Sequence, residues 1–182
     1  MLKRARLLGL LLGLCGCTET ASTPERATES ADEPEANAAP GILTTDVALS
    51  PLAIEYGSLI ATVVAPAGAQ VAARFGVVHV SAPDQRFAIA IDVARGQLDE
   101  RKQVIAENRH NQLVGYRLEE DDALLYESRC DGRSEFHVLV RVALAGTAYE
   151  CTDRKGVPYS LAEAGTMLRA CRSLGGARGE VP

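Results

Sequence analysis

Hydrophobic and polar residues alternate with a period of two along much of the second half of the chain. Every second position of residues 86–93 is Phe, Ile or Val, and residues 135–144 follow the same pattern. Glu135, His137 and Arg141 fall between the apolar positions of the second run. Period-two alternation predicts antiparallel strands that bury one face and expose the other. We therefore expect these three polar side chains on the solvent side.

Shorter apolar runs predict the rest of a sheet. They are rich in the β-branched and aromatic residues that favour strands. These runs are residues 59–64, 76–81, 112–118, 123–130 and 148–153. Asp131-Gly132 and Ala145-Gly146 each separate two such runs, and both pairs suit tight hairpin turns.

Residues 97–110 change to a helical composition. Acidic residues stand near the start of this segment, and Arg109 stands near its end, which agrees with the helix dipole. Its apolar stripe is thin, because only Leu98, Val104 and Ile105 contribute to it. The pattern predicts a helix on the surface of the domain.

A second helix is predicted to start at Ser160 and to end before Gly175-Gly176. Ser160 and Glu163 have the spacing of a capping box. Apolar residues at helical spacing form one face, which is Leu161, Ala164, Leu168 and Cys171. The sequence thus predicts an α+β domain, an antiparallel sheet with a surface helix and a C-terminal helix packed on it.

The first 16 residues have the layout of a secretory signal peptide. Lys3, Arg4 and Arg6 precede an apolar run over residues 7–14. That run is shorter than the roughly 20 residues that a helix needs to span a bilayer. We expect residues 1–16 to be removed from the mature protein.

The next residues resemble the lipobox of bacterial lipoproteins, with Leu14-Cys15-Gly16 before Cys17. The resemblance implies diacylglycerol on the sulfur of Cys17, cleavage before it and acylation, with palmitate or a similar chain, of its new amino group. Several acyl chains hold a protein on a membrane stably. Thr18, in place of Asp, implies delivery to the outer membrane. An ordinary secretory signal with two cysteines is the alternative.

Residues 17–40 contain the lipidated Cys17 followed by an acidic tether, residues 18–40. The tether has no Val, Ile, Leu, Met or aromatic residue, and its six acids and one base give a charge of −5. Such a segment cannot bury enough apolar surface to offset its ordering entropy. We expect a disordered tether, and a single domain over residues 41–182.

Charge and composition exclude some classes of function. The chain has 182 residues and a net charge of −5. Nucleic-acid-binding domains are usually basic, so we expect no nucleic-acid partner. The leader carries three basic residues and the tether −5, so residues 41–182 carry −3. Most of the acidity of the mature chain therefore belongs to the tether.

Motifs that carry chemistry are absent from the sequence. It has no Gly-rich phosphate loop, HExxH, GxSxG or paired CxxC. His79 and His137 would form a metal pair only on neighbouring strands, and the acidic run at residues 119–122 lacks the spacing of a calcium loop. Glu127 and Glu150 are a carboxylate pair only if the fold unites them. We assign no catalytic residue, metal or cofactor.

Three cysteines remain in the domain after the anchor, Cys130, Cys151 and Cys171. An exported protein matures in an oxidising compartment, so these thiols are disulfide candidates. Alternation places Cys151 on the buried face of its strand, and the helical stripe places Cys171 toward the sheet. We predict a Cys151–Cys171 disulfide with Cys130 unpaired, while three reduced thiols are the alternative.

The order of strands, helix, strand meander and C-terminal helix resembles the photosystem II extrinsic P-protein superfamily. The stretch from Leu98 to Leu174 also resembles domains of uncharacterised bacterial lipoproteins. Neither resemblance supplies catalytic residues. We expect a non-enzymatic binding or structural domain, anchored in the cell envelope, that binds an unidentified protein or another envelope component; an envelope protein is one candidate partner. A small apolar ligand and an enzyme of unrecognised type are the two alternatives.

The lipobox gives the first prediction. Cys17→Ala is expected to abolish labelling by a radioactive fatty acid and to release the protein from the membrane fraction, because the substituted residue has no sulfur to acylate. Cys15→Ala is the matched control and is expected to retain both properties. A labelled, membrane-bound Cys17→Ala protein would contradict the lipobox interpretation.

Overall fold

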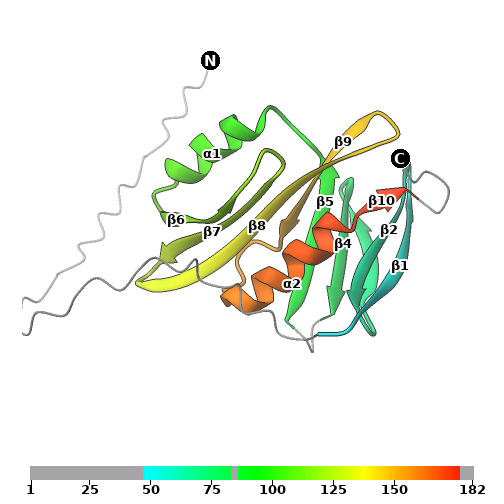
Figure 1. The fold of residues 1–182 in the computed structure, drawn as a ribbon, viewed down its shortest axis with the longest axis horizontal. Coiled ribbons are helices and arrows are strands. Elements are labelled where there is room, and N and C mark those ends of the chain that lie inside the picture. The colour runs from blue at the N-terminus through cyan, green and yellow to red at the C-terminus, as the bar shows by residue number, and fades with distance from the viewer. Residues whose placement is uncertain (1–46, 83–85, 177–182) are drawn as a thin grey trace, which may run out of the picture. The chain divides into compact units, whose positions relative to one another are not determined.

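The computed structural model describes residues 47–82 and 86–176, so the predicted leader, Cys17 and the tether lie outside the described residues. The described part is an α+β fold of strands and two helices (Figure 1). In chain order the elements are β1 (Leu49–Tyr56), β2 (Leu59–Pro66), β3 (Gln70–Arg74), β4 (Val77–Ala82), β5 (Phe87–Val93), α1 (Leu98–Ala106), β6 (Gln112–Glu119), β7 (Ala123–Cys130), β8 (Arg133–Leu144), β9 (Thr147–Asp153), α2 (Leu161–Arg172) and β10 (Gly175–Gly176). No helix within these ranges is long and apolar enough to cross a membrane.

The strands form two antiparallel sheets. The larger has seven strands in the order β3-β4-β5-β9-β8-β7-β6, so that β9 is its central strand. The smaller has three strands in the order β1-β2-β10. In Figure 1, α2 crosses one face of the larger sheet, and the smaller sheet continues the same layer beside it. The predicted class, a sheet with a C-terminal helix packed on it, is confirmed.

The main core lies between the larger sheet and the layer of α2 and β2. A row of inward side chains crosses five neighbouring strands of the larger sheet in register, and all of them are at most 2% exposed. This row is Val78, Ile91, Cys151, Val140 and Ala123. Because each residue continues the row of its neighbour, the period-two pattern of the sequence becomes one continuous apolar surface.

The C-terminal helix α2 covers that surface. Its N-terminus has the predicted capping box, in which the Ser160 hydroxyl accepts from the Glu163 amide and the Glu163 carboxylate accepts from the Ser160 amide. Its inward face is almost entirely buried, with Ala164, Met167 and Cys171 each 0% exposed. Small residues on this face let the helix approach the sheet closely.

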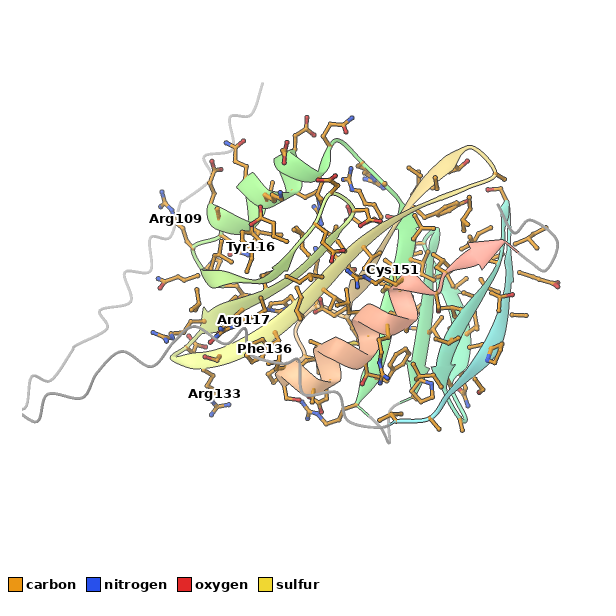
Figure 2. The ribbon with its side chains drawn as sticks, viewed as in Figure 1. Arg109, Tyr116, Arg117, Arg133, Phe136 and Cys151 are labelled. Atoms are coloured by element: carbon orange, nitrogen blue, oxygen red, sulfur yellow. A yellow bond between two sulfur atoms is a disulfide. The ribbon has the colours of Figure 1, made fainter. Side chains whose placement is uncertain are left out.

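The disulfide predicted between Cys151 and Cys171 is present. Their Cα atoms are 5.5 Å apart, and 20 residues separate them in the chain. Cys151 lies in the middle of the central strand and Cys171 in the last turn of α2, so the bond joins the two main layers at their centre (Figure 2). Cys130 is a free cysteine, and it is partly exposed at the end of β7.

The first helix is a surface helix as predicted, but it is shorter than the sequence pattern indicated. α1 ends at Ala106, so Arg109 lies beyond the helix and cannot interact with its last turn. The side chain of Asn108 explains the end, because its Oδ1 accepts from the amides of His110 (3.0 Å) and Asn111 (3.1 Å). An Asn that binds the backbone this way competes with helical hydrogen bonds.

Three strands, β1, β3 and β10, were not predicted from the sequence. β1 contains Pro51 and buries only Ile54 completely, and all five residues of β3 are exposed. These strands therefore lack the alternation that marks a half-buried strand. These strands form because their backbones pair with the neighbouring strands β2 and β4. Backbone pairing leaves no periodic signal in the sequence.

The disulfide gives the second prediction. In a Cys130→Ser background, reduction of the Cys151–Cys171 bond is expected to lower the free energy of unfolding by about 3 kcal/mol, because a loop of this length is no longer constrained in the unfolded chain. Urea denaturation with and without a reducing agent measures the difference. An identical midpoint in both conditions would contradict the assigned role of the bond.

Candidate functional site

The face of the larger sheet opposite α2 is only partly covered. At one end α1 packs on it, where Leu98 joins Leu124 and Leu139 in a small second core. Tyr116, which Figure 2 labels on β6, packs against this second core. Over β3, β4, β5 and β9 the same face remains open in the described part of the chain, and it forms two adjoining grooves.

The two grooves form a continuous depression along these four strands. The larger has a volume of about 500 Å³, and the smaller has a volume of about 360 Å³. Both are lined by His79 of β4 and by Arg154, the residue that follows β9. We call this depression the basic groove. Its basic lining residues are Arg74, His79, Arg95, Arg101, Arg154 and Lys155, and its acidic lining residues are Asp92, Glu150 and Asp153.

Small side chains create the depth of the basic groove. Its lining includes Ala72, Ser81, Ala88, Ala90 and Thr152. They occupy the outward positions of strands whose alternate residues fill the main core. A short side chain leaves space above the sheet, which makes room for a bound group between the long basic side chains at the rim.

Three basic side chains of the groove have no acidic partner among residues 47–82 and 86–176. Arg74, Arg154 and Lys155 are exposed, and none of them makes an ion pair there. Natural surfaces usually intersperse charges of both signs. A group of unpaired cations over small side chains is therefore a suitable site for an acidic group.

The carboxylates of the groove already have partners. Glu150 lies 3.0 Å from the Arg101 guanidinium and 3.4 Å from that of Arg141. Arg141 also donates to the carbonyl of Gly96 at 2.9 Å. This ion-pair group fastens the start of α1 to the sheet at the edge of the groove. Glu150 therefore does not neutralise the unpaired cations.

A second polar group, buried in the sheet, has the atom order of a Ser-His-Asp triad. The Ser128 Oγ lies 2.9 Å from His137 Nε2, and His137 Nδ1 lies 3.0 Å from Asp153 Oδ2. Because a carboxylate only accepts, Nδ1 carries the proton and donates to Asp153, and in the neutral imidazole Nε2 accepts from the Ser128 hydroxyl. Asp153 Oδ1 also accepts from the Val138 amide at 2.8 Å.

The Ser128 and His137 side chains of this triad are buried. Ser128 is 1% exposed, His137 is 7% exposed, and neither lines the basic groove. The Tyr126 ring covers the imidazole, with centroids 5.0 Å apart, and burial raises the pKa of Tyr126. A nucleophile needs space for the reacting carbonyl and donors for its oxyanion. The arrangement therefore satisfies buried polar groups and does not expose a nucleophile.

His137 corrects one expectation from the sequence. It was expected on the solvent side with Glu135 and Arg141, but it is buried. Alternation correctly gives the face of the strand, and that face is covered at this point by Tyr126 and by hydrogen-bonded neighbours. A polar residue on the outer face is exposed only where no other side chain covers it.

The carboxylate pair weighed from the sequence does not form. Glu127 lies on β7 and Glu150 on β9, with β8 between them, and Glu127 instead pairs with Arg117 at 2.5 Å. Hydrogen bonds from Ser134 and then from Arg117 hold the pKa of Glu127 below its usual range. Such a carboxylate stays ionised and is a poor proton donor at neutral pH.

The metal sites weighed from the sequence do not form either. His79 on β4 and His137 on β8 are separated by β5 and β9. In the acidic turn Glu119 pairs with Lys102 at 2.9 Å, and Glu120 pairs with Arg172. Among the described residues no group of three or more His, Cys, Asp or Glu side chains could hold a metal ion.

Comparisons with known proteins give no relative. No family model, no curated protein and no solved structure matches this chain. The site is therefore interpreted from its own geometry and charge.

The sequence indicates His79 and His137 as a candidate metal pair, but it predicts neither the Ser128-His137-Asp153 triad nor the basic groove. Ser128 and Asp153 lie on predicted strands, and alternation places Ser128 on the face opposite Glu127, but only strand order brings them to His137. The adjacent bases Arg154 and Lys155 follow the central strand directly, and this was the available signal for the basic groove.

The buried triad gives the third prediction. Asp153→Ala is expected to lower the free energy of unfolding by about 2–4 kcal/mol, since it leaves two buried donors unpaired, whereas Ser128→Ala is expected to cost about 1 kcal/mol. Urea denaturation measures both. A fluorophosphonate probe is expected to leave Ser128 of the native protein unlabelled. Labelling of Ser128 that His137→Ala abolishes would contradict the structural role and indicate a hydrolase.

Proposed function

We propose that this chain is a lipid-anchored protein of the cell envelope, and that its domain binds an acidic segment of another protein in the basic groove without catalysing a reaction. The acyl chains on Cys17 attach it to the membrane, and the tether lets the domain reach a partner about 30 Å away on average. The observation that carries the proposal is the group Arg74, Arg154 and Lys155, which has no acidic partner in the described part of the chain.

Charge distribution supports an acidic partner. Residues 41–182 carry a net charge of −3, yet the unpaired charges that line the groove are basic. A local field opposite in sign to the net charge raises the association rate of one class of ligand and repels the other. Such a pattern favours specific recognition of an acidic surface over general adhesion.

The shape of the groove supports a macromolecular partner rather than a small apolar ligand. Pockets for small apolar ligands are usually enclosed and have volumes of roughly 300–1,000 Å³. The apolar hollow near Tyr56, Leu59 and Val93 has a volume of only about 150 Å³. The basic groove is larger, but it is open and its rim is charged.

The burial of the triad supports binding over catalysis. Ser128 and His137 have the geometry of a nucleophile and its base, but both side chains are buried. In the groove, Ser81 and His79 lie on the same face of β4, and no hydrogen bond joins them in the described part of the chain. A serine hydrolase is the second candidate, and the fluorophosphonate test above distinguishes it.

The fourth prediction tests the groove by charge reversal. Arg154→Glu combined with Lys155→Glu is expected to weaken binding of a fluorescein-labelled octaglutamate peptide by about tenfold or more at low ionic strength, because attraction becomes repulsion. Fluorescence anisotropy measures the affinity. Both side chains are exposed, so the fold is expected to remain intact.

Arg109→Glu combined with Arg133→Glu is the matched control, since it makes the same change in net charge elsewhere. Figure 2 shows both side chains pointing away from the body of the domain, at the opposite end of the sheet from β3. The control is expected to change the affinity by less than about twofold. An equal loss of affinity in both variants would mean that the peptide responds only to the net charge of the protein. That result would contradict binding in the basic groove.

A further inference from the structure

Strand β3 is an open edge of the larger sheet, beside the basic groove. It is the first strand in the order of that sheet, and no described segment pairs with its outer side. All of its five residues, Gln70 to Arg74, are exposed. It pairs with β4 in continuous register, so its outer backbone N–H and C=O groups form a regular row.

The other long edges are blocked in ways that β3 is not. β1, at the edge of the smaller sheet, contains Pro51, which has no N–H to donate. β6, the opposite edge of the larger sheet, has two register shifts, between Leu113 and Gly115 and between Tyr116 and Leu118. Bulges and proline are common means of preventing edge pairing. β3 has neither of them.

The two faces of β3 present different chemistry to a strand added beside it. Ala72 and Arg74 lie on the face of His79, which is the basic groove. Val71 and Ala73 lie on the other face, opposite Val80 and Val78 of the main core. A strand added here meets cations on one face and apolar side chains on the other.

Phe75, at the tip of the β3–β4 hairpin, is exposed and strained. It is 104% exposed and has a φ of 52°, and Gly76 follows it with a φ of 85°. Such turns prefer Asn-Gly, because an aromatic residue at positive φ is sterically unfavourable. The Phe75 side chain contributes nothing to the core. An exposed aromatic side chain at the end of an open strand is available to pack against a partner, and aromatic residues are frequent anchors of interfaces.

We propose that β3 pairs with an extended segment of the partner protein in which acidic and apolar side chains alternate. The acidic side chains lie over the basic groove, the apolar ones extend the Val71 face, and Phe75 packs against the end of the segment. In this binding mode the backbone hydrogen bonds supply affinity and the alternate side chains supply specificity. The inference rests on the proposed function, because it assigns the conformation of the same acidic partner.

Charge distinguishes this occupant from a second copy of the chain. Antiparallel pairing of two β3 strands centred on Ala72 would place Arg74 opposite the neutral Gln70 of the other copy, which would leave the unpaired cations without acidic partners. An acidic segment provides those partners.

The fifth prediction uses an octapeptide of alternating Glu and Val as the probe. On its addition, amide exchange measured by NMR is expected to slow at least about tenfold at alternate residues of β3, because the outer N–H groups become hydrogen bonded. A block peptide, four Glu followed by four Val, is the composition control and is expected to leave β3 exchange unchanged. Slowing with both peptides would overturn the requirement for alternation.

Phe75→Asn tests the contribution of the β3 edge to binding separately from that of the basic groove. It is expected to raise the Tm, because Asn tolerates the turn, and to raise the Kd for the alternating peptide about fivefold or more. Ala145→Asn is the matched control, since Ala145 has a φ of 48° at the equivalent position of the β8–β9 turn. It is expected to raise the Tm without changing the Kd.

The experiments distinguish a failure of the β3 pairing inference from a failure of the proposed binding in the basic groove. If the alternating peptide binds, and Arg154→Glu with Lys155→Glu abolishes binding, but β3 amides stay unprotected and Phe75→Asn binds normally, the edge inference is overturned and the groove stands. If charge reversal has no effect, both are overturned. A dimer of the free protein that protects β3, seen by analytical ultracentrifugation, would assign the edge to a second copy.

Discussion

The link between β9 and α2 determines how the rest of the domain is arranged. Cys151 stands in the middle of a buried row across the larger sheet, and its disulfide with Cys171 holds α2 against that row. With α2 fixed there, β2 and β10 can complete the same layer, and the Ser173 hydroxyl at the end of α2 accepts from the Val64 amide at 2.8 Å. One face of the sheet is therefore closed by a helix, a small sheet and a covalent bond.

The opposite face has much less cover, and this difference creates the site. α1 is short and buries only Leu98 completely, so it covers only one end of the face. Over the other strands the outward positions carry small residues, with cations at the rim. Antiparallel sheets commonly leave one face in solvent, and on this face the unpaired cations are free to meet a ligand. The basic groove and the open edge of β3 meet on this uncovered part.

The sequence predicted those elements whose residues bury one face, and it failed where pairing alone defines the element. The strands over residues 86–93 and 135–144, the capping box of Ser160 and the Cys151–Cys171 disulfide follow from local periodicity. β3 has no buried residue, so no pattern could indicate it. The adjacent bases Arg154 and Lys155 were visible in the sequence, but their neighbourhood with Arg74 was not predictable, since only the strand order brings β3 near the segment after β9.

The same limit applies to the Ser128-His137-Asp153 triad, and it shows why atom order alone does not identify an enzyme. The pairing of β7 with β8 places Ser128 diagonally across from His137, and Asp153, at the end of the central strand, accepts from the Val138 amide. Each member thus satisfies a neighbour inside the sheet, which is sufficient reason for the arrangement. Catalysis would also require an opening to solvent and an oxyanion site, whereas Ser128 is 1% exposed. The exposed cations and the open strand are therefore the surfaces on which we propose that a partner binds.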